Sequence, residues 1–122
     1  MKSLLFLLFL CSLSEAATRP AQHVFQEHML KLQNAVNSGD LAQVRYLMTE
    51  GAGHVQLPEY FMEKCQGRQI SMEVAYYTKA VAIEGSARVG GDLYHIILRK
   101  YSHRQVDQGW KLEQFNYMSS NH

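Results

Sequence analysis

The chain has few cysteines: among its 122 residues only Cys11 and Cys65 carry a thiol. Cys11 lies in an N-terminal apolar segment that we expect to be removed, which leaves Cys65 alone in the mature chain. One thiol cannot form an intramolecular disulfide, so the small secreted domains that depend on disulfide bonds are excluded. Cys65 is then either a buried thiol or a bridge to a second molecule.

The chain also lacks a hydrophobic run long enough to cross a membrane. The longest one, Leu4–Leu13, follows a lysine and precedes small residues at Ser14 and Ala16, whereas a membrane helix needs roughly 20 apolar residues. This pattern predicts a secretory signal peptide over residues 1–16 and a single mature domain over residues 17–122. We therefore expect a secreted, extracellular protein with no membrane segment after cleavage.

An excess of charge of one sign is absent as well. Twelve basic and eleven acidic residues give a formal net charge of +1, which provides no long-range field to attract a phosphate backbone. The one basic cluster, "RKYSHR" at residues 99–104, is short and is typical of a solvated strand end. We expect no nucleic-acid partner.

No motif for a metal site, a cofactor or a nucleophile is present. His23 and His28 are five residues apart, about 140° around a helix, so they do not share a face. The chain contains no His-x-x-x-His, no zinc-spaced Cys/His pair and no Gly-x-Ser-x-Gly. Only His95 falls inside a predicted strand. We expect no metal, no cofactor and no catalytic residue from these patterns.

Two amphipathic helices are predicted in the N-terminal half. The first begins near Pro20, carries an apolar stripe at Phe25, Met29, Leu32 and Val36, and ends at Ser38-Gly39. Asp40, with Gln43 three residues on, is typical of a helix cap. The second helix then carries Leu41, Val44, Leu47 and Met48 and is expected to end at Gly51. "LPEYFMEKCQG", residues 57–67, predicts a third, shorter helix.

After Gly67 the residue types favour strands. We expect a strand over residues 70–83, a turn at Glu84-Gly85-Ser86, and a long strand over residues 87–101 in which Gly90-Gly91 is a bulge or bend. A polar connection at residues 102–109 precedes a closing strand. In that strand Trp110 and Leu112 fall on one face and Phe115 and Tyr117 on the other, so either both faces are covered or a bulge near Glu113 switches them.

Helices followed by a curved antiparallel sheet predict the α+β class, with a sheet that wraps around the helices in a cone-like or cystatin-like plan. The segments "NAVNSGDLAQVRYLMTEGA", "VAIEGSARVGGDLYHIILRKY" and "GWKLEQF" resemble the helix-break-helix, central hairpin and closing strand of the nuclear-transport-factor-2-like superfamily. The resemblance covers most of residues 21–118, and in size the chain resembles small secreted members of nematode type.

The resemblance implies a cone with a pocket at its wide end and homodimers that pair through the open sheet face. Some relatives are isomerases or cyclases with a catalytic Asp shortly after the second helix. Here the corresponding position falls on Gln56 or Leu57, neither of which acts as a carboxylate base. Candidates for the isomerase's tyrosine donor are Tyr76, Tyr77, Tyr94 and Tyr117, each of which ordinary packing in the sheet would explain equally.

The sequence therefore favours a secreted, non-catalytic binding or interaction domain that holds a small apolar ligand or pairs with a second copy. Its candidate pocket residues are Tyr46, Tyr77, His95 and Trp110, each of which could also be plain core. Two alternatives remain: a cystatin-like protease inhibitor, for which "QVDQG" at residues 105–109 is an imperfect match to the inhibitory loop, and a small pocket enzyme of isomerase or cyclase type.

Overall fold

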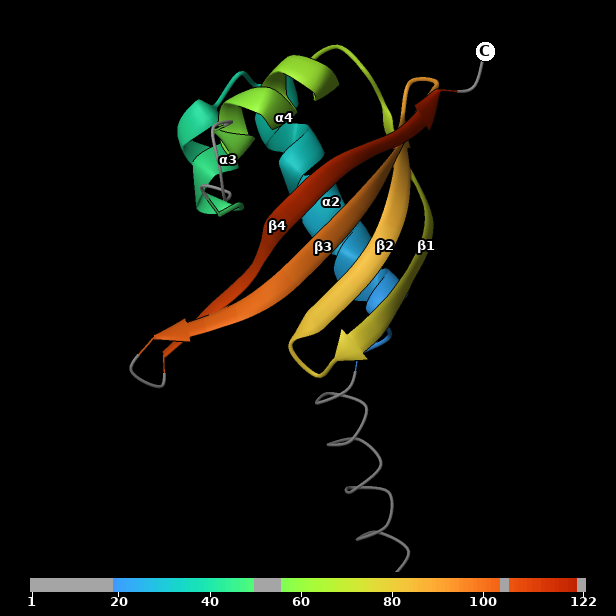
Figure 1. Ribbon diagram of the computed structural model, residues 1–122. Helices are drawn as coiled ribbons and strands as arrows, with labels where there is room; N and C mark the ends of the chain where they lie inside the picture. Colours follow the sequence, from blue (N-terminus) through green and yellow to red (C-terminus); the bar gives the residue numbers. More distant parts are fainter. Residues whose placement is uncertain (1–18, 50–55, 104–105, 121–122) are drawn as a thin grey trace, which may run out of the picture.

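The computed structural model describes residues 19–49, 56–103 and 106–120 (Figure 1). Within them three helices precede four strands: α2 (Ala21–Asn37), α3 (Leu41–Tyr46), α4 (Leu57–Cys65), β1 (Ile70–Lys79), β2 (Ala82–Val89), β3 (Asp92–His103) and β4 (Val106–Ser120). The strands form an antiparallel sheet in the order β1-β2-β3-β4. The predicted α+β class is confirmed.

The first helix and its end agree with the sequence. All four stripe residues of α2 are buried, and the helix ends before Ser38 and Gly39, whose φ of 68° is easily adopted only by glycine. The Gln43 backbone N–H donates to Oδ1 of Asp40 at 3.1 Å, so Asp40 is the expected cap of α3. The third predicted helix is present as α4.

The second helix is shorter than predicted, because α3 ends at Tyr46. The following residues turn to the sheet: the Leu112 N–H donates to the Leu47 carbonyl at 2.9 Å, and the Thr49 N–H donates to the Leu112 carbonyl at 2.9 Å. Leu47 and Met48 are buried as their pattern indicated, but against strand β4 and not on a helix. The expected end at Gly51 lies outside the described residues.

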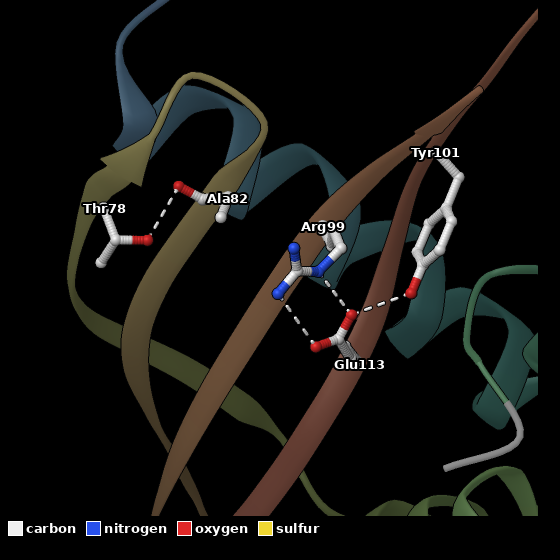
Figure 2. Close-up of polar contacts among 5 residues, drawn as sticks. All are labelled: Thr78, Ala82, Arg99, Tyr101 and Glu113. Atoms are coloured by element: carbon white, nitrogen blue, oxygen red, sulfur yellow. Dashed lines mark hydrogen bonds and ion pairs between the residues drawn. The ribbon is translucent and has the colours of Figure 1, made fainter. Parts of the chain in front are cut away.

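The turn predicted at Glu84-Gly85-Ser86 is wrong, because these residues lie in β2 and the chain turns at residues 80–81. Gly85 is present for close packing. A Cβ added there would lie 2.7 Å from the carbonyl oxygen of Val74 and 2.9 Å from Cε2 of Phe25. At the turn between β1 and β2, the Thr78 hydroxyl donates to the Ala82 carbonyl at 3.4 Å (Figure 2).

Gly90-Gly91 is also not the predicted bulge or bend within one long strand. The pair forms the two-residue turn between β2 and β3, where Val89 pairs with Asp92 and Gly90 has a φ of 63°. A Gly-Gly pair suits such a hairpin because the favoured turns need positive φ. The polar connection predicted at residues 102–109 is shorter than expected, since β3 and β4 continue to the pair His103 and Val106.

A bulge at Glu113 is confirmed. Leu98 pairs with Leu112 and Ile97 pairs with Gln114, so Glu113 has no partner residue across the strands. Its carboxylate accepts from Nε of Arg99 at 2.6 Å and from the Tyr101 hydroxyl at 2.8 Å (Figure 2). Burial alone would raise the pKa of Glu113, but the bonds from Arg99 and Tyr101 outweigh it and lower that pKa.

The core lies between one face of the sheet and the helices, with α2 running diagonally across that inner face (Figure 1). Because side chains alternate along a strand, the residues of β2 that share a face with Gly85 are Ile83, Ala87 and Val89, and all are buried. The remaining buried core residues of the sheet are Tyr94, Ile96, Leu98, Leu112 and Phe115. In the part of the chain that the structure describes, no helix is long and apolar enough to cross a membrane.

Candidate functional site

A pocket of about 330 Å³ opens between the N-terminal half of α2, the end of α3 and strand β4. This volume lies at the low end of the range for small-molecule sites, roughly 300–1,000 Å³. The residues that line it come from the three chain segments 19–31, 46–47 and 109–110, and they are Arg19, Val24, Glu27, His28, Lys31, Tyr46, Leu47, Gly109 and Trp110.

Aromatic and aliphatic side chains form one part of the wall. Trp110 and Tyr46 line the pocket together with Val24 and Leu47. The Trp110 ring is supported by Tyr77, whose ring centroid lies 6.3 Å away at an interplanar angle of 51°. The Tyr77 hydroxyl donates to the Arg19 carbonyl at 2.7 Å. The sheet is therefore connected to the chain segment that begins α2.

Charged side chains form the other part of the pocket wall. The Arg19 guanidinium donates to the Glu27 carboxylate at 2.5 Å, and the Lys31 ammonium lies 3.9 Å from the other oxygen of that carboxylate. Lys111 adjoins the pocket: its ammonium donates to the Tyr46 carbonyl at 2.5 Å and lies 4.4 Å from the centre of the Tyr46 ring.

His28 is the buried polar residue of the site, with 5% of its surface exposed. Its pKa is lowered to about 4, mainly by burial and to a smaller extent by the nearby charges of Lys31 and Lys111, whereas the hydrogen bond with the Leu47 carbonyl acts in the opposite direction. The imidazole is therefore neutral near pH 7. Its Nε2 lies 2.9 Å from the Leu47 carbonyl oxygen and, facing an acceptor, carries the proton and donates it.

The four candidate pocket residues separate into two groups. Tyr46 and Trp110 line the pocket, and Tyr77 lies against Trp110. His95 is not part of the pocket. It pairs with Ser86 across strands, on the outer face of the sheet, and its Nε2 lies 2.5 Å from a carboxylate oxygen of Glu84.

The sequence reasoning missed the polar half of the site, namely Arg19, Glu27, His28 and Lys31. One signal was available: His28 is three residues after Phe25 and four before Leu32, which places it within the apolar stripe of the first helix. A histidine at such a position is expected to be buried and hydrogen-bonded. Glu27 and Lys31 are ordinary charges on the helix surface, and Arg19 lies just before the helix, so only the sheet beside them makes them part of a pocket.

Neither position that corresponds to the catalytic Asp of the isomerases carries a carboxylate. Gln56 is exposed just before α4, and Leu57 is buried in that helix. Tyr94 is stacked on Phe115 with centroids 4.0 Å apart, and burial raises its pKa to about 12. Among the described residues, no group of three histidine, cysteine or acidic side chains is arranged to hold a metal ion.

Cys65 is fully buried, with 0% of its surface exposed, which agrees with the first of its two expected states. Burial raises the pKa of the thiol to about 12. A protonated, inaccessible thiol is a core residue and not a nucleophile.

The segment "QVDQG", considered as a protease-inhibitor loop, begins with Gln105, which lies outside the described residues. Val106 belongs to β4, where it pairs with His103. It is therefore a strand residue.

Comparisons of the chain with protein-family models, with curated proteins and with solved structures found no match.

Proposed function

We propose that this chain is a secreted, non-catalytic binding domain of nuclear-transport-factor-2-like type, which holds a small molecule in the pocket between α2, α3 and β4. The pocket itself carries the proposal. It combines an aromatic wall, Trp110 and Tyr46, with a small number of polar groups at one open cavity, and this is the usual composition of a ligand site.

The ionisable groups of the pocket support binding in preference to catalysis. The hydrogen bond from Arg19 lowers the pKa of Glu27, and a carboxylate with a lowered pKa is a weak base. His28 is neutral, but its Nε2–H is used by the Leu47 carbonyl. Neither group has the near-neutral pKa that suits a general acid or base.

The arrangement of elements supports the cone-like assignment. The break at Ser38-Gly39, the Asp40 cap and the pairing of the chain after α3 with β4 bring the helices to one side of the sheet and leave the pocket at its end. We also propose, from the same resemblance, that two copies pair through the outer sheet face. The half-exposed side chains of Val74 and Tyr76 on β1 support this pairing.

Native mass spectrometry of the protein recovered from the medium of secreting cells tests both proposals. We expect a small-molecule adduct that is lost when the ions are activated, and a mass that corresponds to two chains. The Trp110→Leu variant should lose the adduct, whereas the matched Tyr76→Leu variant on the outer face should keep it. A wild-type protein without any adduct, or an adduct that Trp110→Leu retains in full, would contradict the assignment of this pocket.

A further inference from the structure

We propose that the pocket selects a small organic anion, a carboxylate with an aromatic or short aliphatic body. This inference rests on the proposed function, since it specifies the chemical class of ligand that the same pocket binds.

The first support is the balance of charge at the pocket. Arg19 and Lys31 are the cations that line it, against one carboxylate, Glu27. The Lys111 ammonium, bonded to the Tyr46 carbonyl, adds a further positive charge at the rim. These charges give the pocket a local excess of positive charge, although the formal net charge of the whole chain is only +1.

The second support is that Glu27 leaves cationic donors available. Its carboxylate accepts one guanidinium nitrogen of Arg19, and a guanidinium has five N–H donors. Lys31 lies 3.9 Å from Glu27, beyond hydrogen-bond distance, and the side chains of Arg19 and Lys31 are 51% and 59% exposed. An entering carboxylate can accept from both cations without breaking the Arg19–Glu27 pair.

The third support is that cations from two elements converge. Lys31 comes from α2 and Lys111 from β4, and the charge of each lowers the pKa of the same buried imidazole, His28. The hydrogen bond with the Leu47 carbonyl and the negative charge of Glu27 act on that pKa in the opposite direction. Lys31 lines the pocket, and the Lys111 ammonium donates to the carbonyl of Tyr46, which also lines it, so a cation from each element adjoins the pocket.

The apolar wall explains why the anion should be organic. Trp110, Val24 and Leu47 offer a surface that inorganic phosphate or sulfate would leave uncovered. A ring lying against Trp110, with its carboxylate towards Arg19 and Lys31 and near the charge of Lys111, uses both halves of the site. The volume of about 330 Å³ suits a ligand of roughly one ring with a short chain.

The test uses three probes: 3-phenylpropanoate, its neutral analogue 3-phenylpropanamide, and inorganic phosphate. Trp110 is the only tryptophan of the chain, so its fluorescence reports binding at the pocket directly. At low salt we expect the dissociation constant of the carboxylate to be about tenfold lower than that of the amide, with a difference that shrinks as salt is added. Phosphate should not compete.

Matched variants locate the effect. Lys31→Gln and Lys111→Gln should each weaken carboxylate binding several-fold and amide binding less, so that the ratio of the two affinities falls in each variant. Lys64→Gln is the control, because Lys64 also lies over a tyrosine ring, that of Tyr60, but on α4 away from the pocket. Unfolding curves confirm that each variant is folded. As a second readout, the carboxylate and not the amide should raise the pKa of His28 in an NMR titration.

The outcomes separate the two proposals. Equal affinity for the carboxylate and the amide would overturn the anion inference and leave the binding pocket in place. If neither probe changes Trp110 fluorescence, the proposed function fails together with the inference. Competition by inorganic phosphate at the affinity of the carboxylate would overturn the requirement for an apolar body.

Discussion

The two faces of the sheet are built from alternate residues of the same strands, yet they differ in almost every physical respect. The inner face of β2 presents Ile83, Gly85, Ala87 and Val89 to the core. On the outer face, acidic side chains contact basic ones on neighbouring strands: Glu73 with Arg88 at 2.5 Å, Glu84 with His95 at 2.5 Å, and Glu113 with Arg99 at 2.6 Å.

This difference indicates where the stability of the fold resides. Burial of apolar surface contributes most of the favourable free energy of folding, whereas half-exposed ion pairs are screened by water and contribute little each. The inner face should therefore determine whether the chain folds. The outer face, with its cross-strand pairs, should mainly favour the correct register of the strands.

The largest expected difference between the faces is in the free energy of unfolding lost when an aromatic side chain is removed. Phe25→Ala removes a fully buried ring that packs on Gly85 and should lower the free energy of unfolding by about 3–5 kcal/mol. Tyr76→Ala on the outer face, where the ring is half exposed, should cost about 1 kcal/mol or less. Urea unfolding followed by circular dichroism measures both, and equal losses would contradict the comparison.

The second prediction concerns two histidines on opposite sides of the sheet. The unfolded chain takes up a proton at His28 near pH 6.5, whereas the folded chain does so only near pH 4. The contribution of His28 to stability is thus fully present above pH 6.5 and is lost as the pH falls towards 4. It amounts to about 3 kcal/mol.

The His28→Gln variant should lack this dependence, because glutamine can still donate to the Leu47 carbonyl but does not titrate. Urea unfolding of both proteins at several pH values between 7.5 and 4 measures the difference. His95→Gln on the outer face is the matched control. Parallel pH profiles for wild type and His28→Gln would disprove the assigned role of the buried imidazole.

The third prediction tests overpacking against an equivalent change one residue away. Gly85→Val introduces a branched side chain where Val74 and Phe25 already lie within 3.0 Å of a Cβ, and it should destabilise the fold by about 1–3 kcal/mol. Ser86→Val adds similar volume on the outer face and should change stability by about 0.5 kcal/mol or less. Thermal unfolding of the two variants measures both changes in stability. A Gly85→Val protein as stable as the wild type would refute the close packing at Gly85.

The smallest expected effect is that of an outer ion pair. A double-mutant cycle with Arg99→Gln and Glu113→Gln should yield a coupling free energy of about 0.2–1 kcal/mol, because both side chains are partly exposed to water. Chemical denaturation of the four proteins supplies the values. A coupling above about 2 kcal/mol would show that the pair at the bulge is as important as the core.

Local patterns predicted much of this fold because local physics produces those features. The apolar stripe of α2, the Asp40 cap, α4 and the bulge at Glu113 depend on periodicity and on hydrogen bonds between near neighbours. The two glycine assignments failed for the opposite reason. A glycine signals a turn, a bulge or a close approach, and the choice at Gly85 depends on Phe25, which is 60 residues away.

The candidate site was only half predictable. Their aromatic character made Tyr46, Tyr77 and Trp110 candidates; Tyr46 and Trp110 line the pocket, and Tyr77 contacts Trp110. Nothing local separates them from the fourth candidate, His95, which lies on the other face. Arg19 and Lys31 resemble other surface cations until β4 is placed beside α2.

The sequence by itself determined where the helices begin and the α+β class, since these follow from periodicity, capping and the residue types of single segments. The tertiary structure alone decided that α3 stops at Tyr46, because the backbone of Leu112 supplies partners that compete with another helical turn. It also decided that residues 19–31, 46–47 and 109–110 share a pocket. Contacts between segments so far apart depend on how the whole chain packs.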